Sequence, residues 1–253
     1  MSSSLAWAWP AWYPSKENII ASLCSVALNT MSSQQQAATL NAQGSQVHGF
    51  RTAVDVANFL GIRFGQVDKR FCPARKLSLA DIGPSIDATK WGPRCPQQRN
   101  YGRERRGYLY EDHSAILDTQ QSERDCLNLN IFSPDLAIES DTKLPVLVWI
   151  HGGGWVFGDG GTDYGEILPP TTSRSDGYLD GNGLVAEAIR LNKPFIFVTI
   201  NYRLGYYGFL GSREFEQEAA AEGRPYIPNL GLHDQHLALE WVCTMQTTSR
   251  HSI

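Results

Sequence analysis

The stretch KLPVLVWIHGGGWVFG, residues 143–158, decides the fold. Its central part, Val146–Ile150, is an unbroken apolar run, which is typical of a strand in a sheet that is covered on both faces. One histidine and three glycines, 152–154, follow directly. Glycines at the carboxyl end of a strand allow backbone N–H groups to approach a ligand, because no Cβ blocks the approach and positive φ is permitted. Two such N–H groups aimed at one point can hold the negative oxygen that develops when an ester or amide carbonyl is attacked.

A second apolar run, residues 195–201, predicts another buried strand. Between the two runs, apolar positions in residues 184–189 mark one face of a short helix that ends before Pro194. Strand, helix and strand in succession predict a right-handed parallel crossover, and therefore an α/β fold with a mostly parallel sheet. Short apolar pieces in residues 50–71 predict a small antiparallel hairpin region near the N-terminus. Residues 127–132 alternate with period two, which predicts a strand with one face wetter than the other.

Length and composition fit a globular protein with a sizeable core, since 42% of the 253 residues are hydrophobic. A net charge of −4 and a pI of about 5.9 give no electrostatic footprint for nucleic acid or an anionic membrane, so we expect no nucleic-acid partner. No apolar run reaches the length of a membrane-spanning helix. Five cysteines leave one over if pairs form, and their spacing alone does not choose between disulfides and free thiols.

The two ends of the chain differ from its middle. Residues 1–45 are expected to be a low-complexity or targeting segment, with order beginning near Val47. Residues 19–28 are long enough for the apolar part of a secretory signal, which would make the protein secreted; without such a signal it would be cytoplasmic. A true start at Met31 is equally open. The last helix is expected to be capped by Asp234, and residues 243–253 to form an unrelated polar tail.

No metal site is expected. His233 and His236 lie close together in the sequence, but no third ligand accompanies them, so polar packing or a surface position is the better interpretation.

Several short motifs taken together carry a resemblance to a known family. They are FLGIRF (59–64), CPQ (95–97), DCLNLNI (125–131), the stretch 144–158, INYRLG (200–205) with GFL (208–210), and NLGLHDQ (229–235) with ALEWV (238–242). In this order and spacing the chain resembles the type-B carboxylesterase/lipase family, which also contains the cholinesterases. The resemblance extends over residues 47–242.

The resemblance implies the N-terminal half of an α/β-hydrolase fold that acts on carboxylic esters without metal or organic cofactor. Gly153 and Gly154 match the family glycines whose N–H groups donate to the oxyanion. Trp155 matches a residue that lines the substrate pocket near the acyl group. Cys95 and Cys126 match the first cysteine pair of the family, so the resemblance implies a disulfide between them.

The chain departs from the family at the nucleophile. The serine of this fold sits in a G-x-S-x-G turn between a strand and a helix, and no such pentapeptide occurs in the 253 residues. We therefore expect a chain truncated before the serine, acid and histidine, inactive by itself, with an apolar strand left as an open sheet edge and a complementing C-terminal half as its partner. Ser249 and His251 are not expected to replace the missing groups. The alternative is a non-catalytic binding or interaction protein derived from the hydrolase fold.

Overall fold

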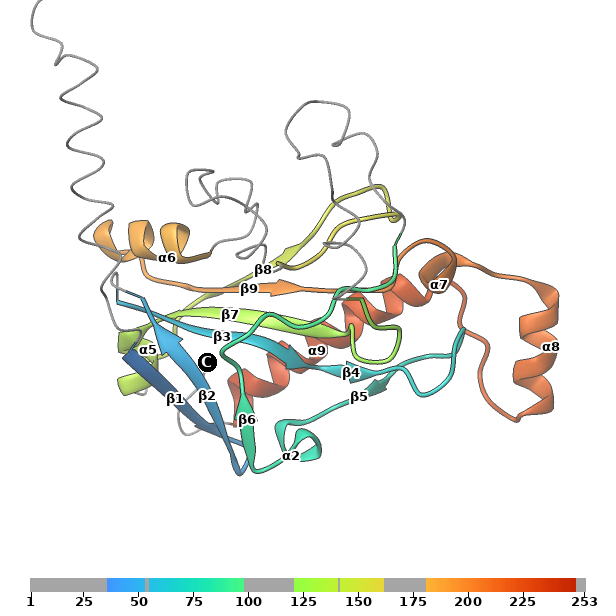
Figure 1. The fold of residues 1–253 in the computed structure, drawn as a ribbon, viewed down its shortest axis with the longest axis horizontal. Coiled ribbons are helices and arrows are strands. Elements are labelled where there is room, and N and C mark those ends of the chain that lie inside the picture. Colours follow the sequence, from blue (N-terminus) through green and yellow to red (C-terminus); the bar gives the residue numbers. More distant parts are fainter. Residues whose placement is uncertain (1–35, 53–54, 98–120, 141, 162–180, 249–253) are drawn as a thin grey trace, which may run out of the picture. The chain divides into compact units, whose positions relative to one another are not determined.

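The computed structural model describes residues 36–52, 55–97, 121–140, 142–161 and 181–248 (Figure 1). These residues belong to one compact unit. The candidate signal segment, residues 19–28, and the residues Ser249 and His251 lie outside the described part of the chain.

A seven-stranded mixed sheet forms the centre of this unit. Its antiparallel part runs in spatial order through β1 (Gln36–Ala42), β2 (Ser45–Arg51), β3 (Val56–Arg63), β7 (Asn128–Pro134) and β9 (Ile196–Ile200). Two strands join it in parallel, namely β8 (Val146–Ile150) beside β9 and the short β6 (Ser85–Asp87) beside β2. A separate antiparallel pair is formed by β4 (Gly65–Gln66) and β5 (Arg75–Lys76). The α/β fold class is confirmed, but the described sheet is mixed and not mostly parallel, because only the pairs β8–β9 and β2–β6 are parallel.

The predicted strand–helix–strand unit is present. Helix α6 (Gly181–Arg190) lies between β8 and β9 in the sequence, and the two strands pair in parallel from Val146 opposite Ile196 to Ile150 opposite Ile200. Parallel neighbours end at the same edge, so the loop after β8 and the loop after β9 lie beside each other. The glycine loop therefore lies at the carboxyl ends of β8 and β9.

The two faces of the sheet carry separate apolar clusters because side chains alternate along each strand. On one face Ile131 and Val198 pack with Trp241 of helix α9 (Leu230–Thr248). On the other face Phe132 and Phe197 pack with Val185 of α6. Figure 1 shows α6 and α9 on opposite sides of the sheet.

Shorter helices complete the described part of the chain: α2 (Leu79–Ile82), α5 (Asp135–Glu139), α7 (Gly205–Phe209) and α8 (Arg213–Ala221). Helix α8 begins where Ser212 Oγ accepts a hydrogen bond from Phe215 N. Helix α2 begins with a capping box formed by Ser78 and Asp81. Among the described residues, no helix is both long enough and apolar enough to cross a bilayer.

Two expectations about the chain ends were wrong. Order begins at Gln36, because Ala38, Leu40 and Ala42 alternate into the core when β1 pairs with β2. At the other end α9 continues to Thr248, so residues 243–248 extend a helix instead of starting a polar tail.

Asp234 is also not a helix cap. It lies inside α9, four residues after the helix begins, and its carboxylate pairs with Arg203. The capping signal was misread because the chain enters the helix at Asn229, which has a positive φ and whose carbonyl accepts hydrogen bonds from Leu232 and His233.

Strands β7 and β8 differ from expectation in opposite ways. Strand β7 is buried along its whole length, because β3 and β9 flank it and its asparagines are hydrogen-bonded inside the protein. Strand β8, which we expected to be covered on both faces, leaves Leu147 and Trp149 49% and 41% exposed. Among the described strands β8 has only β9 as a neighbour, so it is a sheet edge.

Candidate oxyanion site

The glycine loop begins where β8 ends. His151 is buried, Gly153 is half-buried, and Gly152 and Gly154 are exposed. The chain then turns back on itself, because Val156 N and Phe157 N both donate to Gly153 O, at 3.2 and 3.3 Å. The turn places three consecutive residues at positive φ, namely Gly153 at 120°, Gly154 at 62° and Trp155 at 60°.

The N–H groups of Gly153 and Gly154 have no hydrogen-bond partner within the described part of the chain. Backbone N–H groups are normally satisfied when they are buried, so two adjacent unpaired donors belong on an accessible surface. Gly154 is indeed exposed and Gly153 half-buried. The loop therefore presents two neighbouring donors that an incoming oxygen can accept.

Glycine is required at two points of this loop for different contacts. A Cβ on Gly153 would lie 1.7 Å from Phe157 O, so a side chain there is incompatible with the turn. A Cβ on Gly158, which has φ 127°, would lie 2.4 Å from His151 Nδ1. A Cβ on Gly154 would meet nothing within 4 Å, so only its φ favours glycine.

His151 is a structural part of the loop. Its ring stacks on Tyr202, with ring centroids 4.3 Å apart, and Tyr202 Oη donates to His151 O at 2.9 Å. His151 Nδ1 lies 2.9 Å from Gly152 O, which fixes the proton on Nδ1 in the neutral ring. Burial lowers the pKa of His151, and the nearby Gly152 carbonyl and Asp159 carboxylate oppose this shift only in part. The imidazole is therefore neutral at neutral pH and holds the start of the loop.

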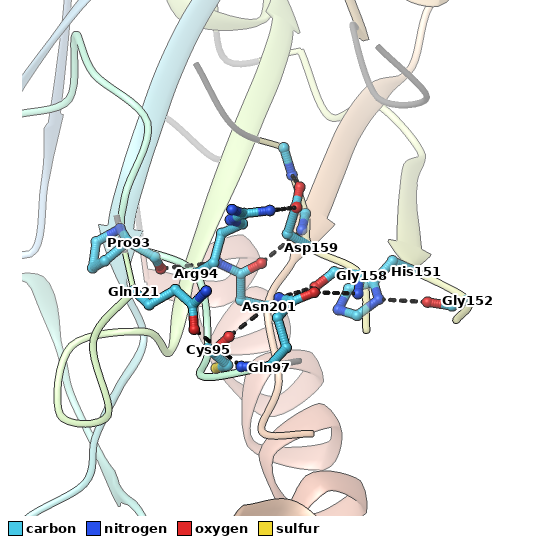
Figure 2. Close-up of polar contacts among 12 residues, drawn as sticks. Pro93, Arg94, Cys95, Gln97, Gln121, His151, Gly152, Gly158, Asp159 and Asn201 are labelled. Carbon is cyan, nitrogen blue, oxygen red and sulfur yellow. Dashed lines mark hydrogen bonds and ion pairs between the residues drawn. The ribbon is translucent and has the colours of Figure 1, made fainter. Parts of the chain in front are cut away.

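Gln97 holds the far end of the loop (Figure 2). Its Oε1 accepts a hydrogen bond from Gly158 N at 2.8 Å, and its Nε2 donates to Gly158 O at 2.9 Å. Gln97 lies two residues after Cys95, whose disulfide with Cys126 joins this segment to the residues just before β7. In the sequence Gln97 appeared only as part of the CPQ motif, and nothing there indicated its contact with Gly158.

Gly160 is held by side chains from strand β7, strand β9 and the loop after β9. Asn201 Oδ1 accepts from Gly160 N at 2.6 Å, Asn130 Nδ2 donates to Gly160 O at 3.0 Å, and Thr199 Oγ1 donates to the same carbonyl. Asn130 and Thr199 are buried and also bond to each other at 2.9 Å. The sequence signal that was missed is the asparagine inside an apolar strand, since a buried amide needs a partner.

Arg94 and Asp159 form an ion pair beside these contacts, with Nη1 and Oδ2 3.3 Å apart. Their side chains are only 5% and 13% exposed, so each charge depends on the other for compensation. The pair gives the glycine loop a further attachment to the segment that carries Cys95.

The residues proposed for the oxyanion site and the substrate pocket lie together. Gly153, Gly154 and Trp155 form one turn, and the Trp155 ring contacts Phe209 at a centroid distance of 5.7 Å while the residue stays 58% exposed. The Cys95–Cys126 disulfide is present, as the resemblance implied, and reaches the loop through Gln97. It closes a loop of 31 residues, for which the chain-entropy relation gives a stabilisation of about 3 to 4 kcal/mol.

No group of three or more His, Cys, Asp or Glu side chains suited to a metal ion occurs in the part of the chain that the structure describes. His233 and His236 lie in α9, where His236 Nδ1 is 3.5 Å from Glu240 Oε1.

Two esterases are among the solved structures that this chain resembles. A thermophilic PNB esterase has a TM-score of 0.55 at 31% identity, over 83% of this chain and 35% of that chain. Juvenile hormone esterase from Manduca sexta has a TM-score of 0.55 at 26% identity, over 86% of this chain and 34% of that chain. The described residues therefore form part of an α/β-hydrolase fold.

The sequence comparisons agree with the fold. The model of the Carboxylesterase family matches residues 36–245. Lipase 2 of Diutina rugosa is 30% identical over 229 residues, which cover 87% of this chain and 37% of that lipase. Lipase 1 of Geotrichum candidum is 41% identical over 137 residues, 54% of this chain and 20% of that lipase. The chain belongs to the carboxylesterase family, and it spans between 20% and 37% of the length of these lipases.

Proposed function

We propose that this chain supplies the oxyanion-stabilising loop of a serine carboxylic ester hydrolase. The observation that carries the proposal is the pair of accessible, unpartnered N–H groups on Gly153 and Gly154 at the carboxyl end of β8. The names of the matched relatives, lipases and esterases, favour this role over a non-catalytic binding protein.

The chemistry follows from where charge develops. When a serine attacks an ester carbonyl, the carbonyl oxygen becomes negative in the tetrahedral intermediate, and fixed N–H donors stabilise it without having to reorganise. One donor of this kind is worth about 3 to 4 kcal/mol in transition-state stabilisation. A histidine removes the serine proton, and water then hydrolyses the acyl-enzyme. Trp155, exposed beside the two donors, would line the acyl side of the pocket.

The nucleophile is not among these 253 residues, since they contain no G-x-S-x-G pentapeptide. We therefore propose that a polypeptide of these residues alone does not hydrolyse esters. The test is the hydrolysis of p-nitrophenyl butyrate by pure chain of verified mass. Turnover clearly above the buffer rate would contradict this part of the proposal.

Residues 36–245, which match the family model, are proposed as the esterase-type part, and the open edge of β8 as the place where a complementing C-terminal half adds its first strand. Among the described strands only β9 pairs with β8, so the other side of β8 offers a row of backbone donors and acceptors, with exposed Leu147 on one face and Ile150 on the other. The substrate would be a small carboxylic ester bound between the two parts.

A chimeric enzyme tests the role of the glycine loop directly. Para-nitrobenzyl esterase of Bacillus subtilis is 36% identical to this chain over 157 residues, so residues 36–245 of this chain, which match the family model, can replace the corresponding residues of that esterase. We expect the chimera to hydrolyse p-nitrobenzyl esters and the same chimera with Gly153→Ala to lose at least a hundredfold in kcat. Gly183→Ala is the control, because a Cβ there meets nothing within 4 Å. Equal kcat for all three proteins would refute the oxyanion role.

A further inference from the structure

We propose that Gln97 is the positioning residue of the glycine loop, holding the turn that presents the Gly153 and Gly154 N–H groups. The inference rests on the proposed function for the purpose of that turn, but the contact itself is a property of the folded chain. Gln97 forms hydrogen bonds to both backbone groups of Gly158, so its amide acts as a one-residue strand partner.

The amide orientation follows from its neighbours. Gln97 Nε2 donates to Gly158 O at 2.9 Å and to Cys95 O at 3.2 Å, two carbonyl oxygens that accept only from a donor. Its Oε1 faces Gly158 N, which is a donor. A side chain with one acceptor and one donor at its end is therefore required, and glutamine is the neutral residue of this length that has both.

The base of the side chain is fixed as well. Gln97 N donates to Gln121 Oε1 at 3.0 Å (Figure 2). Cys95, two residues before Gln97, is covalently joined to Cys126, which is fully buried. The amide thus extends from an anchored backbone and does not pay the full entropy of ordering a surface side chain.

The contact between Gln97 and Gly158 acts on the Gly153 and Gly154 N–H groups through the close packing of the loop. Gly158 lies against His151 and Gly152, where no Cβ would fit, and Phe157 just before it closes the turn on Gly153 O. Gly160, two residues further on, is held independently by Asn201 and Asn130. Loss of the Gln97 amide should therefore loosen residues 153–158 and leave Gly160 in place.

Amide hydrogen exchange of the full chain, followed by NMR, tests this. In Gln97→Met, which keeps the length of the side chain without its amide, exchange at Val156, Phe157 and Gly158 should be about tenfold faster, the size expected for the loss of one hydrogen bond. Exchange at Gly160 should stay within twofold of the wild type. The control is Gln43→Met, because Gln43 also bonds a backbone N–H, that of Leu79, at a distance from the loop; it should leave all four amides unchanged.

Gln97→Glu separates positioning from general support of the fold. At pH 8 its carboxylate cannot donate to the carbonyls of Gly158 and Cys95, so the loop should be as loose as in Gln97→Met. At pH 4.5 the protonated form regains one donor and one acceptor, and the exchange protection, corrected for the intrinsic rate, should return towards that of the wild type.

Two outcomes would overturn the proposal: unchanged protection of residues 156–158 in Gln97→Met, or an equal loss at every core amide in both variants at both pH values. The measurement requires no ester chemistry. An inactive chimera would refute the proposed function while leaving the role of Gln97 standing.

Discussion

Arg203 and Asp234 form a bidentate ion pair with almost no access to solvent. Arg203 Nε and Nη2 each lie 2.7 Å from one oxygen of the Asp234 carboxylate, and the Arg203 backbone N–H donates to the same group at 3.1 Å. The two side chains are 1% and 0% exposed. This pair joins the loop after β9 to helix α9, at the carboxyl ends of β8 and β9, where the glycine loop also lies.

Replacing Asp234 by asparagine should destabilise the chain strongly. The variant leaves the guanidinium of Arg203 buried without a counter-charge, for which the expected loss is about 3 to 5 kcal/mol in the free energy of unfolding. The measurement is urea unfolding followed by tryptophan fluorescence. Glu123→Gln is the matched control, because Arg70 and Glu123 have the same two 2.7 Å contacts but are 58% and 24% exposed. A loss of similar size in both variants would contradict the importance of burial.

Alanine at Gly153 and at Gly154 should have different effects within one turn. Gly154→Ala forces a residue with a Cβ to φ 62° but meets no neighbour, so we expect a loss of about 1 to 2 kcal/mol and an unchanged loop. Gly153→Ala meets Phe157 O and must open the turn, so its loss should be larger. The NMR signals of Val156 and Phe157, which donate to Gly153 O, should shift in the second variant only. Identical spectra for the two variants would show that the turn is not closed in this way.

The sequence predicted the elements of this fold better than their surroundings. The apolar runs at Val146–Ile150 and Ile196–Ile200 are strands in parallel register, because local hydrophobic pattern is sufficient to indicate a strand. The open edge at β8 was expected from the missing C-terminal half, but the apolar pattern did not indicate that Leu147 and Trp149 would be exposed, since the cover of a strand face depends on distant contacts. The same reason explains the misread Asp234, whose partner lies 31 residues away.

The candidate site divides in a similar way. The three glycines could be identified from the sequence, because three in succession after a strand have few structural uses. Gln97, Asn130 and Asn201 hold the loop through contacts between segments that are distant in the chain, and no local pattern reports such contacts. Asn130 was even assigned to a wetter strand face, although it is buried and hydrogen-bonded to Gly160.

The stability of the chain should fall when the pH is lowered below about 6.5, in part because of His151. Burial lowers the pKa of His151 in the folded state, so the unfolded chain takes up a proton first as the pH falls through the usual histidine pKa of about 6.5. The contribution of His151 is therefore complete above about pH 6.5 and is lost progressively as the pH falls towards the folded-state pKa. His151→Phe keeps a ring to stack on Tyr202 but does not titrate.

The measurement is the difference in unfolding free energy between wild type and His151→Phe at several pH values from 8 to 5. We expect the difference to be constant above pH 7 and to move in favour of the variant as the pH falls. A difference independent of pH would mean that the folded protein protonates His151 as readily as the unfolded chain does.

Strand β8 should drive self-association of the isolated chain. Its backbone groups on the side away from β9 have no strand partner in the described sheet, and Leu147 and Trp149 stand exposed on one face. An exposed apolar edge strand is a template for pairing with a second copy. Lysine at both positions keeps the buried contacts of Val146 and Val148 on the opposite face but places charges along the edge, so Leu147→Lys with Trp149→Lys should reduce light scattering and increase the monomer fraction in sedimentation velocity. Leu184→Lys is the matched control, because Leu184 is 46% exposed and belongs to helix α6, not to strand β8. If all three proteins sediment alike, the edge of β8 is not the site of association, and the proposed docking of a complementing half at that edge loses its support.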